Sequence, residues 1–341
     1  PYRLNALSIK VRNGATLTID TSSGEVQIVS KNNGDFQIGN GSGDEGYLQL
    51  DASSGAIKFR MKRSSNLIIN PYGQVTTTDA TAVTYFENNG AIGSENYDWG
   101  AIDFEAGQQY QSHLINCDIS GGGYDSKDGA IVVRSTSDNT PLLEDLTFDS
   151  CNTSAIRFDG NGINTLRQDG LKLPLTVTNT DYVFYLNAVT STVPIRFPDP
   201  DSPASPEIKL SGTCTIGSGT SVSHWRFDGG YTFDCVASSL LDVEHGSVWG
   251  NEESPAVFQS ISVTPGFTDW SGLQDIDTTY SNIIAAGIGP FAFVTVKDAS
   301  NGVKVDKGTS GTPLDGARMR LPGLTLRHCA TGMYLRSPDG T

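Results

Sequence analysis

The sequence lacks clusters of basic residues. It has 23 lysine and arginine residues against 38 aspartate and glutamate residues, a formal net charge of −15 at pH 7 and an isoelectric point near 4.6. The densest basic stretch, Phe59 to Arg63 (FRMKR), stands alone. A nucleic-acid interface needs clustered lysine and arginine to neutralise phosphates, so the composition excludes nucleic acid as a partner. An acidic surface instead keeps a protein soluble and attracts cations.

The sequence also lacks a long apolar run and any Cys-x-x-Cys pair. The longest apolar stretch, Ile283–Val296, is too short to span a bilayer and contains Pro290. We therefore expect no transmembrane segment. The five cysteines form neither a disulfide framework nor a zinc set. Because their number is odd, at least one thiol is unpaired within the chain.

No stretch keeps, over three turns, the apolar spacing that an amphipathic helix needs. Short runs of alternating apolar and polar residues occur instead, each bounded by Gly, Asn, Asp or Ser. Alternation of this kind is typical of strands with one buried face. The clearest runs are Leu7–Val11, Thr16–Asp20, Val26–Val29, Phe36–Ile38, Tyr47–Leu50 and Ala56–Arg60. The sequence therefore predicts a nearly all-β protein.

One phrase of sequence recurs along the chain. Leu146–Phe158 (LTFDSCNTSAIRF) and Leu324–Leu335 (LTLRHCATGMYL) each hold a threonine that is followed eight positions later by an apolar strand. The threonines that begin such a phrase are Thr147, Thr176, Thr232, Thr295 and Thr325. Subtraction of their numbers gives separations of 29, 56, 63 and 30 residues, so the long gaps are close to twice the short ones. A period of about 30 residues predicts stacked coils, with the phrase at the same corner of each coil.

Short connections between β-strands make a parallel β-helix the natural stack. We predict a single elongated β-helix over residues 1–341, with coils of about 30 residues. Spacing is tighter over residues 1–90, which suits three strands per coil, and the coils of residues 91–341 are longer. Where the period is broken we expect loop excursions, and functional residues are best sought there. These breaks lie near residues 120–129, 198–206 and 268–280.

The stretch from Asn66 to Val133 carries NLIINPYGQVTTTDATAVTYF, then DWGAIDF, then LINCDISGGG and then DGAIVV. These elements resemble secreted right-handed parallel β-helix proteins of the pectin-lyase-like superfamily. Members often combine a Gly-x-Val coil, a Trp-Gly-x-Ile-x-Phe strand and a Leu-x-x-Cys-x-Ile element. The superfamily includes pectin-lyase-like enzymes, surface adhesins and phage tailspikes. The resemblance implies the right hand of the β-helix, and it leaves function open because one fold hosts many activities.

The resemblance also implies which residues a hydrolase would need. Polygalacturonase-like enzymes carry Asn-Thr-Asp, Asp-Asp, His-Gly and Arg-Ile-Lys elements, with paired carboxylates for acid and base catalysis. This chain has Asn179–Asp181 and His245–Gly246, but no Asp-Asp pair. Glu207–Lys209 (EIK) is a poor substitute for Arg-Ile-Lys, and Tyr182 replaces the Gly that follows the family's Asn-Thr-Asp. A turn between coils explains Asn179–Asp181 better, so we assign no catalytic residue.

A lyase of this superfamily would need an acidic calcium cluster and a basic residue that abstracts a proton. No compact Asp-x-Asp-x-x-Arg element occurs. Asp199–Glu207 (DPDSPASPE) supplies carboxylates, but its prolines predict a stiff, extended excursion. Acids on separate coils can still converge in space. Three or more convergent carboxylates would therefore favour an enzyme.

Gly39–Tyr47 (GNGSGDEGY) resembles one copy of the calcium-binding nonapeptide of β-rolls, but no tandem copy follows. We expect a Gly-rich turn that binds Ca²⁺ only adventitiously or between subunits. None of the four histidines has metal-ligand spacing, and corner positions are expected for them. They are His113, His224, His245 and His328. We assign no cofactor-binding residue, metal ligands stay unknown, and Ca²⁺ is the one cofactor that the sequence suggests.

Cys151 and Cys329 occupy the same place in the repeated phrase, and Cys117 and Cys235 lie within about one residue of it. A column of small inward-facing side chains is therefore expected. A disulfide between Cys214 and Cys235 is not favoured. Several aromatic residues flanked by polar residues either stack on sugars or cap the core, and the repeated Asp-Trp favours the structural role. They are Trp99, Trp225, Trp249, Trp270, Tyr97 and Tyr231.

Because no catalytic set is complete, the sequence favours a non-enzymatic extracellular structural protein: a surface stalk, an adhesin or a filament-forming subunit. We expect an extracellular or cell-surface location. Self-association or other surface proteins are the expected partners, with glycans as further candidates. Coil ends with unpaired strands would support end-to-end association. Two alternatives stay open: a polysaccharide lyase or glycoside hydrolase, and a phage tail fibre or tailspike.

Overall fold

The protein is built almost entirely from β-strands. In the described ranges the one helix is a short 3-10 helix, Gly160–Leu166 (η1). In the same ranges, no helix is long or apolar enough to cross a membrane. The expectation of an all-β chain is confirmed. The computed structural model describes residues 2–6, 8–31, 33–79, 81–88, 99–124, 126–134, 139–167, 170–244, 246–262, 264, 266, 268–275, 291–306 and 321–336.

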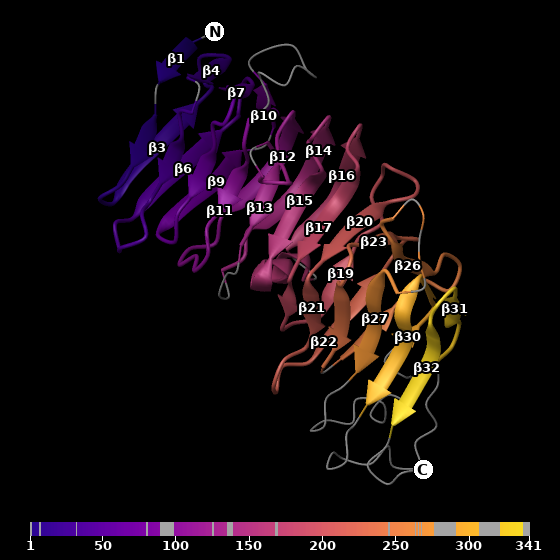
Figure 1. Cartoon of the computed structure of the whole chain (residues 1–341). Helices are drawn as coiled ribbons and strands as arrows, with labels where there is room; N and C mark the ends of the chain where they lie inside the picture. The colour runs from indigo at the N-terminus through magenta and orange to yellow at the C-terminus, as the bar shows by residue number, and fades with distance from the viewer. Residues whose placement is uncertain are drawn as a thin grey trace. The chain divides into compact units, whose positions relative to one another are not determined.

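The chain divides into two compact units, each described by itself. Each unit is a parallel β-solenoid in which successive turns of the chain add strands to the same sheets (Figure 1). Unit 1 comprises Pro1–Thr165, Asp169–Tyr185 and Pro200–Ala204, and unit 2 comprises Leu166–Gln168, Leu186–Asp199 and Ser205–Thr341. A single elongated β-helix over the whole chain stays a prediction.

In unit 1, sheet A begins as two rows of strands that later merge. The first row is β1 (Tyr2–Ala6), β4 (Val26–Ser30), β7 (Ile57–Met61) and β10 (Thr84–Asn88), and the second is β3 (Ala15–Asp20), β6 (Gly46–Asp51) and β9 (Gly73–Asp79). The longer β12 (His113–Ser120) pairs with both β9 and β10, and β14 (Leu142–Asp149) and β16 (Leu171–Thr178) stack on it (Figure 1). β12 bends at Asn116, whose φ of 52° is left-handed.

Sheet B supplies the third strand of each early coil, so three strands per coil are confirmed for the N-terminal part. In unit 1 its strands are β2 (Ile9–Val11), β5 (Phe36–Ile38), β8 (Leu67–Ile69), β11 (Ile102–Phe104), β13 (Ile131–Val133) and β15 (Ser154–Asp159), and β17 (Tyr182–Asn187) follows in the chain. Phe36 lies opposite Leu67, 31 residues on, and Leu146 lies opposite Leu175, 29 residues on. The predicted coil of about 30 residues is confirmed, since turns average about 29.

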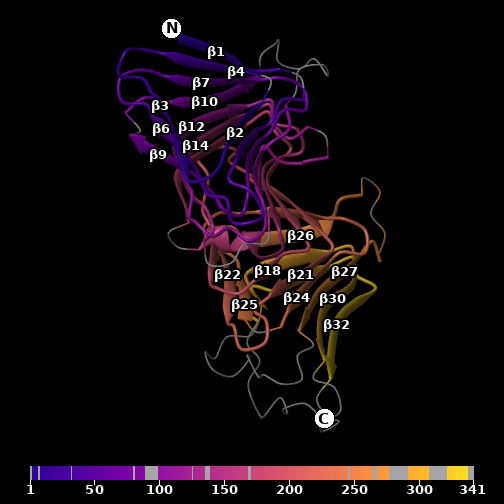
Figure 2. The same ribbon diagram turned by 90° about the vertical axis from the view of Figure 1, so that its left-hand side faces the viewer.

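Unit 2 also has three strands per coil. Its sheet B strands are β20 (Glu207–Ser211), β23 (Thr232–Cys235), β26 (Ala256–Ser260), β29 (Val294–Lys297) and β31 (Thr325–Arg327). Sheet C holds β18 (Thr190–Ser191), β21 (Thr213–Ile216), β24 (Leu240–Val243), β27 (Trp270–Asp275), β30 (Ala299–Asp306) and β32 (Thr331–Arg336), several of which lie side by side in Figure 2. Sheet D holds β19 (Ile195–Phe197), β22 (Ser223–Phe227), β25 (Gly246–Trp249) and β28 (Phe291–Ala292).

The core of each unit is a set of apolar columns. Every second residue of a strand points inward, so residues that pair between coils also stack inside the solenoid. Phe59 lies on Phe86 with ring centroids 4.8 Å apart, and Phe233 lies on Phe258 at 4.2 Å. Burying one such side chain stabilises the fold by about 1.5–3 kcal/mol. Each coil thus buries its apolar side chains against the adjacent coils, which a single coil could not do.

The repeated phrase marks two different corners, and the expectation of one shared corner is wrong. Leu146–Phe158 joins sheet A to sheet B in unit 1, whereas Leu324–Leu335 joins sheet B to sheet C in unit 2. Both corners turn at a left-handed residue, Ser150 (φ 53°) or His328 (φ 50°), directly before the cysteine. Similar turn geometry, rather than equivalent position, explains the similar sequence.

The cysteines act as interior filling, as expected. All five thiols are free, and four of them are buried: Cys117, Cys151, Cys214 and Cys235. Burial raises the pKa of Cys151 and of Cys214 to about 12, so these thiols stay protonated. They do not form one column, because Cys117 lies opposite Leu146 rather than Cys151.

The structural role expected for most of the aromatic residues is confirmed. Trp99, Trp225, Trp270 and Tyr231 are fully buried. The indole nitrogens of Trp99 and Trp270 each donate a hydrogen bond to a backbone carbonyl at 2.7 Å, and that of Trp225 donates to Ser191 Oγ at 2.9 Å. Trp249 is only half-buried. Tyr97 lies outside the described residues.

Candidate active site

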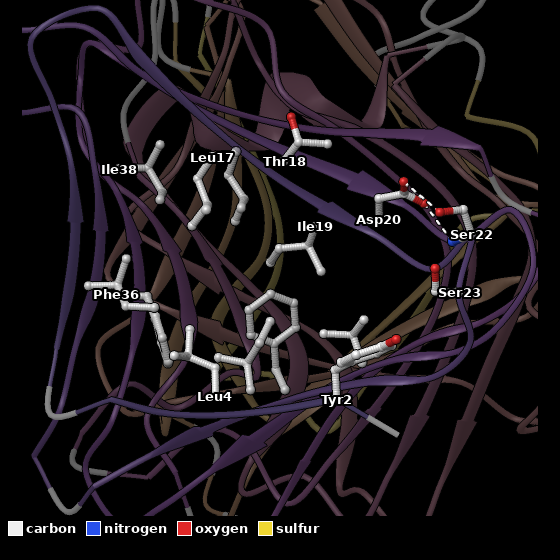
Figure 3. A pocket seen from close by; sticks show the side chains of 15 residues that line it. Tyr2, Leu4, Leu17, Thr18, Ile19, Asp20, Ser22, Ser23, Phe36 and Ile38 are labelled. Carbon is white, nitrogen blue, oxygen red and sulfur yellow. Dashed lines mark hydrogen bonds between the residues drawn. The ribbon is translucent and has the colours of Figure 1, made fainter.

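An apolar cavity, about 440 Å³ in volume, lies at the N-terminal end of unit 1 (Figure 3). Its walls are interior side chains of the first coils, among them Leu17, Ile19 and Phe36. The one carboxylate among the residues that line it is Asp20, and Ser22 already donates to it from N at 2.6 Å and from Oγ at 2.9 Å. The cavity is the open interior of a coil, and catalytic groups have to be sought elsewhere.

Charged side chains gather on the outer side of sheet B in unit 1. Asp103 of β11 lies opposite Val132 of β13, which in turn lies opposite Arg157 of β15. Because side chains alternate along a strand, these three residues share one face. The charged face, as we call it, is defined by Asp103, Glu105, Lys127, Asp128, Arg134, Arg157 and Asp159.

Asp103 anchors this face. Its side chain is 0 % exposed, Lys127 Nζ lies 2.6 Å from Oδ2, and Arg134 donates to both carboxylate oxygens at 3.0 Å. A hydrogen bond to Asp103 is the largest of the effects that raise the pKa of Arg134. A buried carboxylate needs such compensation, and removing one partner of a buried ion pair costs about 3–5 kcal/mol. Asp103 is therefore a structural brace that fixes two cations.

Arg134 also contacts two further carboxylates. Its Nε lies 3.6 Å from Glu105 Oε1, and its Nη1 lies 3.5 Å from Asp159 Oδ2. Glu105 is 39 % exposed and belongs to the coil before Arg134, whereas Asp159 belongs to the coil after it. One guanidinium thus holds acidic groups from the coil before it and the coil after it in fixed positions.

Arg157 holds a second pair of carboxylates. Its Nε lies 3.0 Å from Asp159 Oδ1 and its Nη1 lies 3.2 Å from Asp128 Oδ2. The guanidinium also lies over the ring of Tyr185 at 5.2 Å. Gly129 makes this approach possible, because a Cβ there would come within 2.8 Å of the Arg157 Cβ. One guanidinium thus fixes the positions of two carboxylates.

The excursion near residues 120–129 supplies two members of the charged face, Lys127 and Asp128. The excursion near 198–206 instead returns to sheet A, where Asp201 N donates to Leu175 O at 2.9 Å. In the third, near 268–280, residues up to Asp275 form β27, and the remainder lies outside the described residues. The break at 120–129 is therefore the one that we connect with chemistry.

The residues of Asn179–Asp181, the segment that resembles a hydrolase motif, have different roles. Asn179 Nδ2 donates to Asp149 Oδ1 at 2.8 Å, and Thr180 Oγ1 accepts from Cys151 N at 3.0 Å. These two residues build the turn, as expected. Asp181 is exposed at the start of β17, and among the described residues no side chain pairs with its carboxylate.

Asp181 occupies the same corner as Asp128, two coils further on. Ser154 Oγ donates to Asp128 O at 2.5 Å, and Tyr182 N donates to Thr153 O at 3.0 Å. The three corners are therefore stacked in register. At about 4.8 Å per coil, the backbones of Asp128 and Asp181 are roughly 9.6 Å apart. Inverting glycosidases place their two carboxyl groups about 6.5–9.5 Å apart.

Other residues that the sequence singled out do not join the charged face. Glu207 and Lys209 lie on β20 in unit 2, and His245 lies outside the described residues. In Gly39–Tyr47, Asn40 Oδ1 accepts from the backbone of Ser42 and Asp44, so the segment is an Asx turn.

His113 and His328 each lie near a carboxylate. His113 lies 3.8 Å from Glu144, and His328 Nδ1 lies 2.6 Å from Asp298 Oδ1. Over the described part of the chain, no three His, Cys, Asp or Glu side chains are arranged to hold a metal ion. A role for Ca²⁺ stays a prediction.

Comparison with known proteins links the chain to one enzyme. It is 28 % identical to Endopolygalacturonase II of Aspergillus niger over 131 residues, which cover 38 % of this chain and 33 % of that enzyme. The match thus spans about a third of the enzyme's length. No family model matches the sequence, and no solved structure matches it significantly. Together with the parallel β-solenoid, this similarity supports the resemblance to the pectin-lyase-like superfamily.

The similarity contradicts the non-enzymatic structural function expected from the sequence and supports the hydrolase or lyase alternative. The expectation failed because it required contiguous motifs. The charged face draws its carboxylates from separate coils, so no short stretch of sequence contains them. A search for acidic and basic residues separated by one period of about 30 would have connected Asp103 with Arg134, which are 31 residues apart.

Proposed function

We propose that the chain carries a glycoside hydrolase site that cleaves an acidic polysaccharide at the charged face and at the corner that Asp128 shares with Asp181. The observation that carries the proposal is the convergence of four carboxylates with three fixed cations on one outward face. Similarity to an endopolygalacturonase supports the reaction class. A polysaccharide substrate also supports an extracellular location.

Asp128 and Asp181 are the proposed catalytic pair. Asp128, whose Oδ2 lies 3.2 Å from Arg157 Nη1, is the proposed general base that activates water. Asp181, on the same corner two coils further on, is the proposed general acid that protonates the leaving oxygen. Because their backbones lie two coils apart, we expect space for a water molecule between the two carboxyl groups and hence inversion at the anomeric carbon.

The three cations of the charged face favour a negatively charged substrate. Lys127, Arg134 and Arg157 lie between the carboxylates, and each is between 16 and 31 % exposed. A uronate carboxylate would be attracted to these partly exposed donors, whereas a neutral sugar would gain less from them. Polygalacturonate is therefore the substrate to test first.

The test is hydrolysis of polygalacturonate by the full chain, followed as new reducing ends and by NMR of the first product anomer. We expect inverted product, and Asp128→Asn and Asp181→Asn should each lower the rate by about 10²–10⁴-fold, the usual contribution of one acid or base. Asp20→Asn, a carboxylate outside the charged face, is the matched control. Unsaturated products would identify a lyase and overturn the hydrolase, as would full activity of both variants.

Self-association, surface-protein partners and Ca²⁺ binding stay predictions beside this proposal. Equilibrium sedimentation with and without Ca²⁺ addresses the first and the last of them.

A further inference from the structure

A second cavity, about 370 Å³ in volume, lies on sheet D of unit 2. This size is within the range of small-ligand sites, about 300–1,000 Å³. Its lining combines basic and aromatic side chains, which is unusual in a chain with a net charge of −15. The lining residues are Pro194, Ile195, Arg196, His224, Arg226 and Trp249.

The strand register places two arginines side by side in this cavity. Arg196 of β19 lies opposite Arg226 of β22, which lies opposite Trp249 of β25. Like charges directly opposite each other on neighbouring strands destabilise a sheet. Asp228 compensates Arg196, with its Oδ2 2.6 Å from Arg196 Nε. Arg226 is exposed, and among the described residues no carboxylate pairs with it. An anion bound beside Arg226 would offset the repulsion between the two arginines.

The other wall of the cavity is aromatic. His224 and Trp249 are stacked with ring centroids 5.5 Å apart and planes 13° apart, and His224 Nδ1 lies 2.8 Å from Ser247 Oγ, which fixes the ring. The Trp249 Nε1 atom is buried, and no described residue accepts a hydrogen bond from it. A ligand acceptor could satisfy this donor.

We propose that the cavity binds a sugar that carries a carboxylate. The carboxylate is held by the guanidinium of Arg226, with Arg196 beside it, and a face of the sugar ring lies on the exposed part of Trp249. Guanidinium groups match carboxylates in a two-point geometry, and aromatic rings flanked by polar groups suit the apolar faces of sugars. This site is separate from the charged face, so it is a binding site and not a catalytic one.

The proposal is tested by intrinsic fluorescence, because Trp249 alone among the four tryptophans is not fully buried. The full chain is titrated with a short oligogalacturonate, with a neutral galacto-oligosaccharide and with sodium sulfate. We expect a saturable change with the oligogalacturonate, and at least tenfold weaker binding of the other two probes. Trp249→Phe should abolish the signal.

Arg226→Gln should weaken binding about tenfold or more, since a hydrogen bond to a charged group contributes about 1.5–3 kcal/mol. Arg327→Gln, an exposed arginine on sheet B of the same unit, should bind like the unmodified chain. Equal binding of the neutral probe, equal binding of sulfate, or unchanged binding by Arg226→Gln would each overturn the proposal. Asp128→Asn protein is titrated in parallel: binding that persists there separates this site from the proposed hydrolase.

Discussion

Both units place arginines on the outer side of a parallel ladder, but the two units neutralise them differently. In unit 1, Arg134 and Arg157 each contact at least two carboxylates of the charged face. In unit 2, Arg196 has one carboxylate, and Arg226 has none among the described residues. Paired arginines hold carboxylates in position and offer a substrate only their exposed edges, whereas an arginine with spare donors beside a cavity is placed to bind an anion directly. The comparison separates a scaffold for catalysis from a site for recognition.

The largest effect should come from removing Asp103, the buried carboxylate of the charged face in unit 1. Asp103→Ala would leave Lys127 and Arg134 without their buried counter-charge, and we expect the free energy of unfolding to fall by about 3–5 kcal/mol. Asp228→Ala removes the partner of Arg196, which is 58 % exposed, and should cost no more than about 1 kcal/mol. Urea denaturation of both variants measures the difference. Equal losses would remove the distinction between the two units.

A smaller effect is expected where the backbone approaches Arg157. Gly129→Ala places a Cβ against the Arg157 Cβ and backbone, and overpacking of this kind costs about 1–3 kcal/mol. Because Arg157 holds Asp128, the rate of hydrolysis should fall with the stability. Gly41→Ala is the control, since a Cβ at Gly41 meets no atom within 4 Å. Hydrolysis at the original rate by Gly129→Ala would show that Arg157 does not position Asp128.

The smallest effect concerns the partly buried carboxylate of Asp118. Burial is the main cause that raises the pKa of Asp118 on β12. The folded state therefore binds a proton on Asp118 more tightly than the unfolded chain does. The protonated carboxyl group stabilises the fold at low pH, and this contribution is lost as the pH rises from about 4 through the raised pKa. Asp118→Asn should gain stability relative to the unmodified chain over that range. Because Asp118 is only partly buried, the gain should stay below about 1 kcal/mol. Denaturation curves at several pH values check the sign, and a gain toward low pH would contradict it.

Much of the fold could be predicted from the sequence. Alternation at Phe36–Ile38 and Tyr47–Leu50 predicted strands with one buried face, and the period of the threonines predicted the coil length. Both signals are local, because they follow from side-chain alternation and turn chemistry. The pair of sheets that each corner joins could not be predicted from the local sequence. Cys151 and Cys329 each follow a left-handed residue, yet they lie between different pairs of sheets.

The charged face could not be predicted, for a related reason. Its contacts join residues one coil apart, such as Asp103 with Arg134, and short motifs cannot reveal such contacts. Coil length also varies, from 23 residues between Ser223 and Gly246 to 38 between Ala256 and Val294. A fixed period therefore loses register within a few coils. The break at residues 120–129 was visible in the sequence, but the residues that Lys127 and Asp128 contact were not.

The stacking of coils also limits how this chain can change its length. Asp103 and Arg134 meet because whole strands lie in register, and a shift of one residue within a strand turns its outward side chains inward. A single-residue deletion inside β11 would therefore exchange the apolar interior with the charged exterior over that coil. Removal or addition of an entire coil preserves every remaining ladder. Lengthening by whole coils, and variation at corners, are thus the changes that such a protein can accept while keeping its chemistry.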